Sequence, residues 1–362
     1  MRYILSGGGT GGHIYPALAI ASELKNRDEN NEILYVGKKG SLEEELVTKA
    51  GFDFSPIHIE GLPRKALNKQ TITSGIQLLR GLRESKKIIK KFKPDVVIGT
   101  GGYVCAPIVY EAQKHNIKTV VQEQNAYPGK TNRFLAKNAD LVSINFDEAK
   151  KYLNSNNIVY TGNPIRNDFK VIDKNKAAKE LNMPLDKKIV LSFGGSGGQE
   201  STNEAVIEIL KSGKNIDFRL IHITGKPHYE YVMNQLKGIE IPENVKILDY
   251  SHEIPDLLMV SDLVIASSSA MTLAEISAVG VASILIPKDY TAGNHQVHNA
   301  NSYKEKKAST VILEADLNGD VLYNRIEELL NDDALRLEMG SYAKQLGDVE
   351  AVKNLADKIE NL

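Results

Sequence analysis

The chain has a single cysteine, no long apolar run and almost no net charge. Cys105 is the only cysteine among 362 residues, so no intramolecular disulfide forms and a zinc centre built on several cysteines is excluded. No apolar stretch approaches the roughly 18 residues that are needed to span a bilayer. The formal net charge of −1 gives no general affinity for nucleic acid. Because the N-terminus leads directly into a β-type run, we expect a cytosolic protein that meets a membrane only through its surface.

The sequence also lacks an Asp-x-Asp pair. Metal-bridged diphosphate chemistry needs hard oxygen ligands, and such a pair is a common source of them. We therefore expect neither a metal ion nor a cofactor in the site.

Two series of β-type runs alternate with helical patterns, which predicts βαβ units and parallel sheets. The runs are 33–36, 56–59, 95–98, 119–121, 141–144 and 159–161 in the first series, and 189–193, 218–223, 245–248, 263–266, 283–286 and 310–313 in the second. We predict an α/β fold of two Rossmann-like, doubly wound domains that face each other across a cleft. The predicted domains are 1–161 and 162–340, and a C-terminal helix in 341–362 closes the structure and packs back toward the N-terminal domain.

A glycine-rich loop at residues 7–12 follows the first predicted strand, and a helical run begins at Ala17, with Pro16 suited to its first turn. The free N–H groups of such a loop and the positive end of the helix attract phosphates. His13 lies where the loop becomes a helix. That position indicates chemistry as well as binding, although a histidine there can also act as a helix cap.

The spacing Gly7-x-Gly9-x-x-Gly12 also fits the dinucleotide-binding fingerprint. That fingerprint needs an acidic residue about 20 positions further on, at the end of the second strand. Here the second predicted strand is followed by Lys38 and Lys39. The pattern therefore disfavours a nicotinamide-dependent enzyme.

Further loops at the predicted carboxyl ends of strands carry glycine or polar residues. The turn at 99–103 is expected beside the first loop, where the two make a pocket for a diphosphate. In the second half, 194–198 repeats the glycine loop. Glu275 enters a helix at a position suited to the ribose hydroxyls. The polar segment 293–300 suits either sugar hydroxyls or a helix cap.

Residues 64–93 form a basic segment in an otherwise neutral chain. Ten lysines and arginines are opposed there only by Glu84, and Ile76, Leu79 and Leu82 supply an apolar component. Such a segment suits an anionic membrane surface. The alternative is a solvated helix whose aliphatic side chains lie in the core.

Taken together, these motifs resemble those of the MurG glycosyltransferases, in register from residue 3 to about 300. The matching stretches are 7–13 with Pro16, 101–103, 123–126, 162–166, 194–196, 270–275 and 295–300. The resemblance implies a GT-B fold and metal-independent, inverting transfer of GlcNAc from UDP-GlcNAc to lipid I, the undecaprenyl-diphospho-MurNAc-pentapeptide, which gives lipid II for peptidoglycan synthesis. It also implies a peripheral protein on the cytoplasmic side of the cell membrane.

The resemblance assigns roles by position, with His13 as the general base. The substrate-binding positions are Thr10, Gly11, Gly12, Asn125, Arg166, Ser196, Ala270, Met271, Thr272, Leu273, Ala274, Glu275, Gln296 and Asn299. The loops around the acceptor diphosphate contain Gly8, Gly9, Gly101, Gly102 and Tyr103. The docking surface for an anionic membrane comprises Ile76, Leu79, Leu82, Arg80, Arg83, Lys86 and Lys87.

Three positions depart from the family pattern. Gln122, Ser267 and Ser269 stand where many members carry histidine, arginine and glycine, respectively.

Two alternatives to the transferase also remain: an enzyme like the UDP-GlcNAc 2-epimerases, which needs no acceptor, and a nucleotide-sugar sensor that binds without turnover.

Overall fold

The computed structural model describes residues 1–61, 69–165, 169, 173–195 and 197–362. The chain divides into two compact units: unit 1 comprises Met1–Ile165 and Glu350–Leu362, and unit 2 comprises Arg166–Val349. The sequence pattern places the boundaries after residues 161 and 340. The contacts within each unit place the second boundary after Val349, because helix α13 (Asp333–Leu346) continues through residue 341 as part of unit 2.

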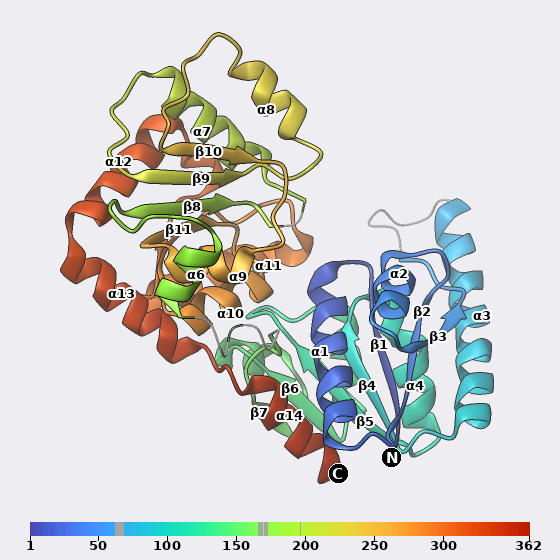
Figure 1. Cartoon of the computed structure of the whole chain (residues 1–362). Helices are drawn as coiled ribbons and strands as arrows, with labels where there is room; N and C mark the ends of the chain where they lie inside the picture. Colours follow the sequence, from blue (N-terminus) through green and yellow to red (C-terminus); the bar gives the residue numbers. More distant parts are fainter. Residues whose placement is uncertain (62–68, 166–168, 170–172, 196) are drawn as a thin grey trace. The chain divides into compact units, whose positions relative to one another are not determined.

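Within the described residues, unit 1 is built on a seven-stranded parallel sheet in the order β3-β2-β1-β4-β5-β6-β7 (Figure 1). Its strands are β1 (Arg2–Gly7), β2 (Glu32–Lys38), β3 (Asp53–Ile57), β4 (Val96–Gly101), β5 (Lys118–Glu123), β6 (Leu141–Ile144) and β7 (Ile158–Tyr160). The strand order reverses between β1 and β4, so the loops after these two strands meet at a topological switch point. Ligands of open α/β sheets bind at such points.

Helices cover both faces of this sheet, because successive residues of each strand point to opposite sides. Leu5 packs with α1 (Gly11–Arg27), whereas Ile4 packs on the other face with α4 (Ala106–Lys114). The remaining helices are α2 (Leu42–Lys49) and α14 (Ala351–Glu360) on the α1 side, and α3 (Lys69–Phe92) and α5 (Lys130–Leu135) on the α4 side. Short 3-10 turns occupy Tyr103–Cys105, Ala136–Asn138 and Asp147–Tyr152.

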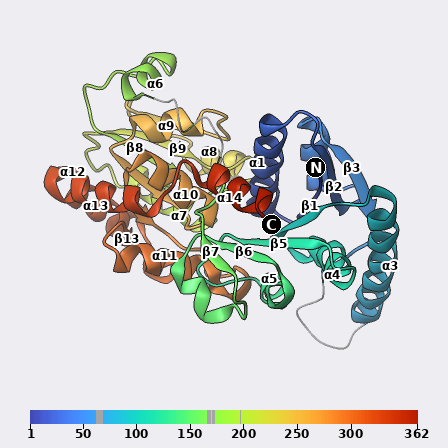
Figure 2. The same cartoon turned by 90° about the horizontal axis from the view of Figure 1, so that it is seen from below.

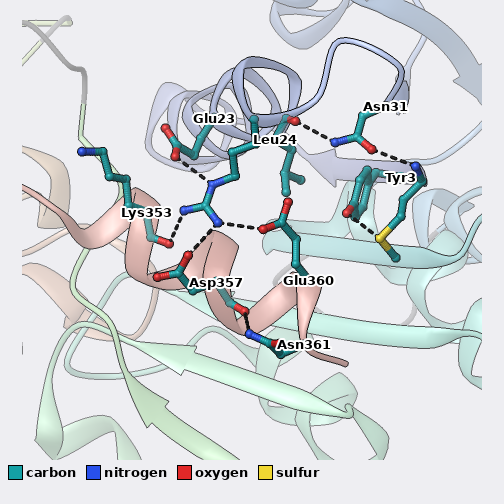
Figure 3. Close-up of polar contacts among 10 residues, drawn as sticks. Tyr3, Glu23, Leu24, Asn31, Lys353, Asp357, Glu360 and Asn361 are labelled. Atoms are coloured by element: carbon teal, nitrogen blue, oxygen red, sulfur yellow. Dashed lines mark hydrogen bonds and ion pairs between the residues drawn. The ribbon is translucent and has the colours of Figure 1, made fainter.

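The C-terminal helix α14 completes the core of unit 1, and Figures 1 and 2 show it beside α1. Arg27, the last residue of α1, connects the two helices. Its guanidinium donates to Asp357 Oδ1 at 2.6 Å, to Glu360 Oε2 at 2.7 Å and to the Lys353 carbonyl oxygen at 2.9 Å (Figure 3). The apolar face of α14 is buried; its buried residues are Ala351, Val352, Leu355, Ala356 and Ile359.

Unit 2 repeats the architecture with a six-stranded parallel sheet among the described residues, in the order β10-β9-β8-β11-β12-β13. Its strands are β8 (Ile189–Phe193), β9 (Arg219–Ile223), β10 (Val245–Leu248), β11 (Leu263–Ala266), β12 (Ala282–Leu285) and β13 (Thr310–Val311). The order reverses between β8 and β11. The prediction of two doubly wound halves is therefore confirmed.

The helices of unit 2 alternate with its strands. They are α6 (Lys174–Glu180), α7 (Glu200–Lys211), α8 (Tyr229–Gln235), α9 (Ile254–Val260), α10 (Ala270–Val279), α11 (His295–Glu305), α12 (Gly319–Asn331) and α13, with 3-10 turns at Ala292–Asn294 and Glu314–Asp316. Among the described residues, no helix has both the length and the apolar character that are needed to span a bilayer.

The first helix begins earlier than the sequence pattern predicts. Pro16 is expected in the first turn, but α1 starts at Gly11, so Pro16 lies in the second turn and that prediction is wrong. The Thr10 carbonyl oxygen accepts hydrogen bonds from the N–H groups of His13 at 3.1 Å and Ile14 at 3.3 Å, which draws the two glycines into the helix. His13 therefore lies in the first turn, near the positive end of the helix.

Candidate active site

The half-buried side chain of His13 is held by the ends of two neighbouring strands. Its Nδ1 lies 3.2 Å from the carbonyl oxygen of Thr100, on β4, and 3.2 Å from Oε1 of Gln124, which directly follows β5. The Thr100 hydroxyl also donates to the His13 carbonyl oxygen at 2.7 Å. Both the ring and the backbone of His13 are therefore fixed against the sheet.

The two glycine-rich turns of unit 1 pack directly against each other, as predicted. The Gly8 N–H donates to the Gly101 carbonyl oxygen at 3.4 Å. Gly101 and Gly102 have φ values of 108° and 77°, which residues with a side chain rarely adopt. A Cβ on Gly102 would clash with the Gly8 carbonyl oxygen, and one on Gly101 would lie 2.8 Å from His13 Nδ1. Glycine is required at both positions.

The other predicted residues of this loop lie around the same edge. Gly9 has a φ of 84°, and a Cβ there would lie 3.4 Å from the Tyr103 ring. Thr10 and Gly12 are exposed, and Gly11 is half-buried. The structure therefore brings this group of predicted residues together at the carboxyl ends of β1 and β4.

Glu123 folds the segment that contains Asn125. The Glu123 side chain is buried, and its Oε1 accepts from the backbone N–H of Asn125 at 2.9 Å and from the Asn125 side-chain amide at 3.1 Å. Its Oε2 accepts from the Gly129 N–H at 3.1 Å and from Asn132 Nδ2 at 2.9 Å. Glu123 is therefore an organising group, and Asn125 is presented at the strand end by its contacts.

Glu43 is a buried residue of the site that the sequence reasoning missed. A Cβ on Gly8 would lie 2.7 Å from Glu43 Oε1, so this carboxyl group underlies the glycine loop, and it accepts from the Lys38 N–H at 3.2 Å. Burial, followed by the charges of Glu43 and Glu60, raises the pKa of Tyr103. The sequence feature that could have indicated this role is the position of Glu43, just after the short turn at Gly40 and Ser41 that follows the second strand.

Sequence reasoning assigned no role to Thr100, Gln122, Gln124 or Asn163, although each stands at a position or in a stretch that it singled out. Gln122 Nε2 donates to Asn163 Oδ1 at 3.0 Å, and Asn163 Nδ2 donates to the Gln124 carbonyl oxygen at 3.2 Å. The polar run at 122–125, at the end of β5, indicated polar contacts here but not which residues are their partners.

In unit 2, Gly194, Gly195, Gly197 and Gly198 lie between β8 and the N-terminus of α7. Gly195 and Gly198 have φ values of 82° and 73°, and the Gly198 N–H donates to the Gly195 carbonyl oxygen at 3.0 Å. Lys288 Nζ donates to the Gly198 carbonyl oxygen at 2.7 Å, and burial lowers the pKa of this lysine. The Lys288 N–H in turn donates to Gln296 Oε1 at 3.0 Å.

The serine-rich loop at 267–269 leads from β11 into α10, and it is hydrogen-bonded to α11. Ser269 caps α10, because its Oγ accepts from the Thr272 N–H at 3.3 Å. Ser268 Oγ donates to the Gln296 carbonyl oxygen at 2.7 Å, and Asn299 Nδ2 donates to the Ser268 carbonyl oxygen at 3.1 Å. The predicted positions in α10 and α11 thus belong to one connected edge of unit 2.

Most of the predicted binding residues in α10 and α11 have buried side chains. Glu275 and Met271 are half-buried, whereas Leu273 and Asn299 are fully buried. The other buried positions are Ala270, Thr272, Ala274 and Gln296. A ligand at the start of α10 would therefore meet mainly backbone groups. Arg166 and Ser196 lie outside the described residues, and the roles of all these positions stay predictions.

Helix α3 exposes apolar side chains between basic ones. Ile76 is 61 % exposed and Leu79 is 58 % exposed, so the alternative that places these two in the core is wrong; Leu82 is half-buried. The exposed basic residues of the predicted surface are Arg80, Arg83, Lys86 and Lys87. A hollow of about 400 Å³ is lined by Leu79, Leu82, Arg83, Lys86, Glu111, Lys114 and His115. Residues 64–68 of the basic segment lie outside the described residues.

Known proteins match the chain over its whole length. Residues 3–144 match the glycosyltransferase family 28 N-terminal domain, and residues 189–357 match the glycosyltransferase family 28 C-terminal domain. A curated relative from Finegoldia magna is 46 % identical, with 100 % of this chain and 98 % of the relative covered. One from Acetivibrio thermocellus is 42 % identical, with the same coverage. Both are named UDP-N-acetylglucosamine--N-acetylmuramyl-(pentapeptide) pyrophosphoryl-undecaprenol N-acetylglucosamine transferase.

A solved structure supports the same fold. The crystal structure of Acinetobacter baumannii MurG has a TM-score of 0.80 and 23 % sequence identity, and it covers 100 % of this chain and 99 % of that one. Together with the two parallel-sheet units and the matched domains, this likeness confirms the predicted GT-B fold. The chain belongs to glycosyltransferase family 28.

Proposed function

We propose that this glycosyltransferase moves GlcNAc from UDP-GlcNAc to the C4 hydroxyl of the MurNAc sugar in lipid I, which makes lipid II for peptidoglycan synthesis. The names of relatives at 46 % and 42 % identity over full length support the substrates. The structural observation that carries the proposal is His13, an imidazole fixed in the first turn of α1 beside two glycine-rich turns.

His13 acts as the general base in this proposal. The C4 hydroxyl must lose its proton as it attacks the anomeric carbon, and histidine is the side chain whose ordinary pKa lies nearest to neutral pH. Direct attack from the face opposite the leaving group inverts the anomeric configuration. The glycine loops beside His13, at 7–12 and 99–103, offer their N–H groups to the acceptor diphosphate.

Unit 2 holds the donor in this proposal. UDP gains negative charge as it departs, and the N-terminus of α7, directly after the glycine loop at 194–198, favours that charge. Arg166 and Ser196 match family positions near the diphosphate. With such groups in place, the reaction proceeds without a metal ion.

The remaining donor contacts come from α10 and α11. Glu275 accepts hydrogen bonds from the ribose hydroxyls, and the segment from Ala270 to Ala274 surrounds the uridine. Gln296 and Asn299, whose side chains are buried, match family positions near the GlcNAc and hold the edge that the sugar meets. The bond from the Lys288 N–H to Gln296 Oε1 supports this role for Gln296, because it orients the other end of the amide.

We propose that α3 docks the protein on the anionic cytoplasmic face of the cell membrane, where lipid I is anchored. The exposed Ile76 and Leu79, set among exposed basic side chains, support this placement. Apolar side chains insert among the acyl chains, and each basic residue near anionic lipids adds about 1 kcal/mol.

The direct test is product analysis with purified protein, UDP-GlcNAc and a short-chain lipid I analogue. Mass spectrometry should show an acceptor heavier by one N-acetylhexosamine, and NMR should show a β-linkage. Formation of UDP-ManNAc without acceptor would instead identify an epimerase. Binding of UDP-GlcNAc with no turnover in either assay would identify a sensor.

A further inference from the structure

We infer that Gln124 is a positioning residue that fixes the tautomer of His13, so that Nε2 is the ring nitrogen that takes up the proton. The catalytic consequence rests on the proposed function. The tautomer itself follows from contacts within unit 1, and it can be measured without any substrate.

The contacts of His13 Nδ1 require it to carry a proton. One neighbour is the Thr100 carbonyl oxygen at 3.2 Å, which can only accept a hydrogen bond. The other is Gln124 Oε1, also at 3.2 Å. A neutral imidazole has one N–H, so a proton on Nδ1 leaves the lone pair on Nε2.

The orientation of the Gln124 amide is set by its other partners. Its Nε2 donates to the Thr100 carbonyl oxygen at 2.6 Å and to Gln122 Oε1. If the amide were turned over, its oxygen would face these two oxygens, and both contacts would become repulsive. The Nε2 end must therefore point to Thr100, which leaves Oε1 to face His13.

A closed set of buried amides holds Gln124 in this orientation. Gln122 receives a bond from Gln124 and donates to Asn163 Oδ1 at 3.0 Å, and Asn163 Nδ2 returns to the Gln124 carbonyl oxygen at 3.2 Å. All three side chains are at most 2 % exposed. Satisfied polar networks of this kind rigidify a site, because each member costs free energy if it turns away.

The arrangement has a direct effect on catalysis. Oxygen acceptors on Nδ1 favour the neutral tautomer with a basic Nε2, and they also stabilise the imidazolium that forms when Nε2 is protonated. Without Gln124 Oε1, one of these two acceptors on Nδ1 is lost and the ring is held less firmly in this tautomer. The proton-transfer step should slow, while donor binding in unit 2 should not change.

The first test is nitrogen NMR of the whole protein labelled with ¹⁵N-histidine, with the His13→Ala variant used to identify the His13 signals. The wild-type spectrum should show a protonated Nδ1 and an unprotonated Nε2 for His13 at neutral pH. The opposite tautomer, or an even mixture of the two, would overturn the inference without any measurement on a Gln124 variant.

The second test compares kinetics of wild type and Gln124→Leu with UDP-GlcNAc and the lipid I analogue. We expect kcat to fall at least tenfold and the KM for UDP-GlcNAc to stay within twofold. Gln113→Leu is a matched control, because Gln113 Nε2 also donates to a backbone carbonyl, that of Leu135 at 2.9 Å, away from His13. A folded Gln124→Leu variant with unchanged kcat would overturn the inference, whereas a wild type without turnover would defeat the proposed function and leave the tautomer result standing.

Discussion

At the scale of single residues, Gly101 is the position where an added side chain would press most directly on the His13 ring. Its φ of 108° strains any residue with a side chain, and a Cβ there would lie 2.8 Å from His13 Nδ1. We expect Gly101→Ala to displace the imidazole and to lower kcat at least tenfold, a loss of about 1.4 kcal/mol or more in transition-state stabilisation.

The matched control for this prediction is Gly129→Ala. Gly129 has a φ of −61°, and a Cβ there would meet nothing within 4 Å. Steady-state kinetics on both variants decides the matter. Equal activity of Gly101→Ala and wild type would mean that catalysis does not depend on the position of the His13 ring against β4.

A buried histidine of unit 2 makes stability depend on pH. Burial lowers the pKa of His222 to about 4, while one ring nitrogen pairs with Ser192 Oγ at 3.0 Å. The unfolded chain takes up a proton near pH 6.5, so the free energy of unfolding falls as the pH drops from there toward 4. We expect wild type to lose about 2 kcal/mol from this group between pH 7 and pH 5.

Urea unfolding at the two pH values measures this loss. His222→Gln should remove most of it, because glutamine does not titrate. His252→Gln replaces an exposed histidine and serves as the control. If wild type and His222→Gln lost the same free energy on acidification, the buried imidazole would not be the cause.

At the scale of elements, the prediction concerns α3. The double variant Ile76→Asp with Leu79→Asp adds two negative charges to the exposed face of α3. We expect it to lose most of its binding to vesicles of anionic phospholipid. A co-sedimentation assay at physiological salt measures the bound fraction. Leu337→Asp is the control, because Leu337 is 72 % exposed on α13 of unit 2. Equal vesicle binding by the double variant and wild type would rule out this docking surface.

The strands were more predictable from sequence than the start of the first helix. The runs at 141–144, 189–193 and 263–266 coincide with β6, β8 and β11, because apolar runs bounded by turn residues identify buried parallel strands. The strand expected at 56–59 is instead β3, at Asp53–Ile57. Its pairing with β2 from Leu34 and Asp53 onward sets that position, and a local pattern does not contain the pairing.

Only part of the candidate site could be predicted in the same way. The glycine turns were predictable, because their composition itself indicates tight turns and close approach. The contacts of His13 with Thr100 and Gln124 depend on the register of three strands, such as the pairing of Leu5 with Ile98. The sequence pattern fixes which residues are buried but not which residues stand opposite each other.

At the scale of the whole molecule, the last residues of the chain complete its first unit. Leu355 on α14 is fully buried with α1 and the β1 sheet. We expect Leu355→Ala to destabilise the protein by about 2–5 kcal/mol. Leu337→Ala, at an exposed position, should change stability by less than about 0.5 kcal/mol.

Hydrogen exchange locates the effect of Leu355→Ala. The amides of β1, β2 and α1 should exchange faster in this variant, while those of β8 to β12 keep their protection. Faster exchange in unit 2 alone would contradict the division in which residues 350–362 belong to unit 1.

The measurement that tests the central claim most directly is UDP release from UDP-GlcNAc by wild type and His13→Ala, with and without a lipid I analogue, in buffer that contains a chelator. We predict release by wild type that depends on the analogue and persists with the chelator. His13→Ala should lose at least 100-fold in rate, about 2.7 kcal/mol, and still bind UDP-GlcNAc. Release that ignores the analogue, or a His13→Ala variant as fast as wild type, would contradict an acceptor-directed transfer with His13 as its base.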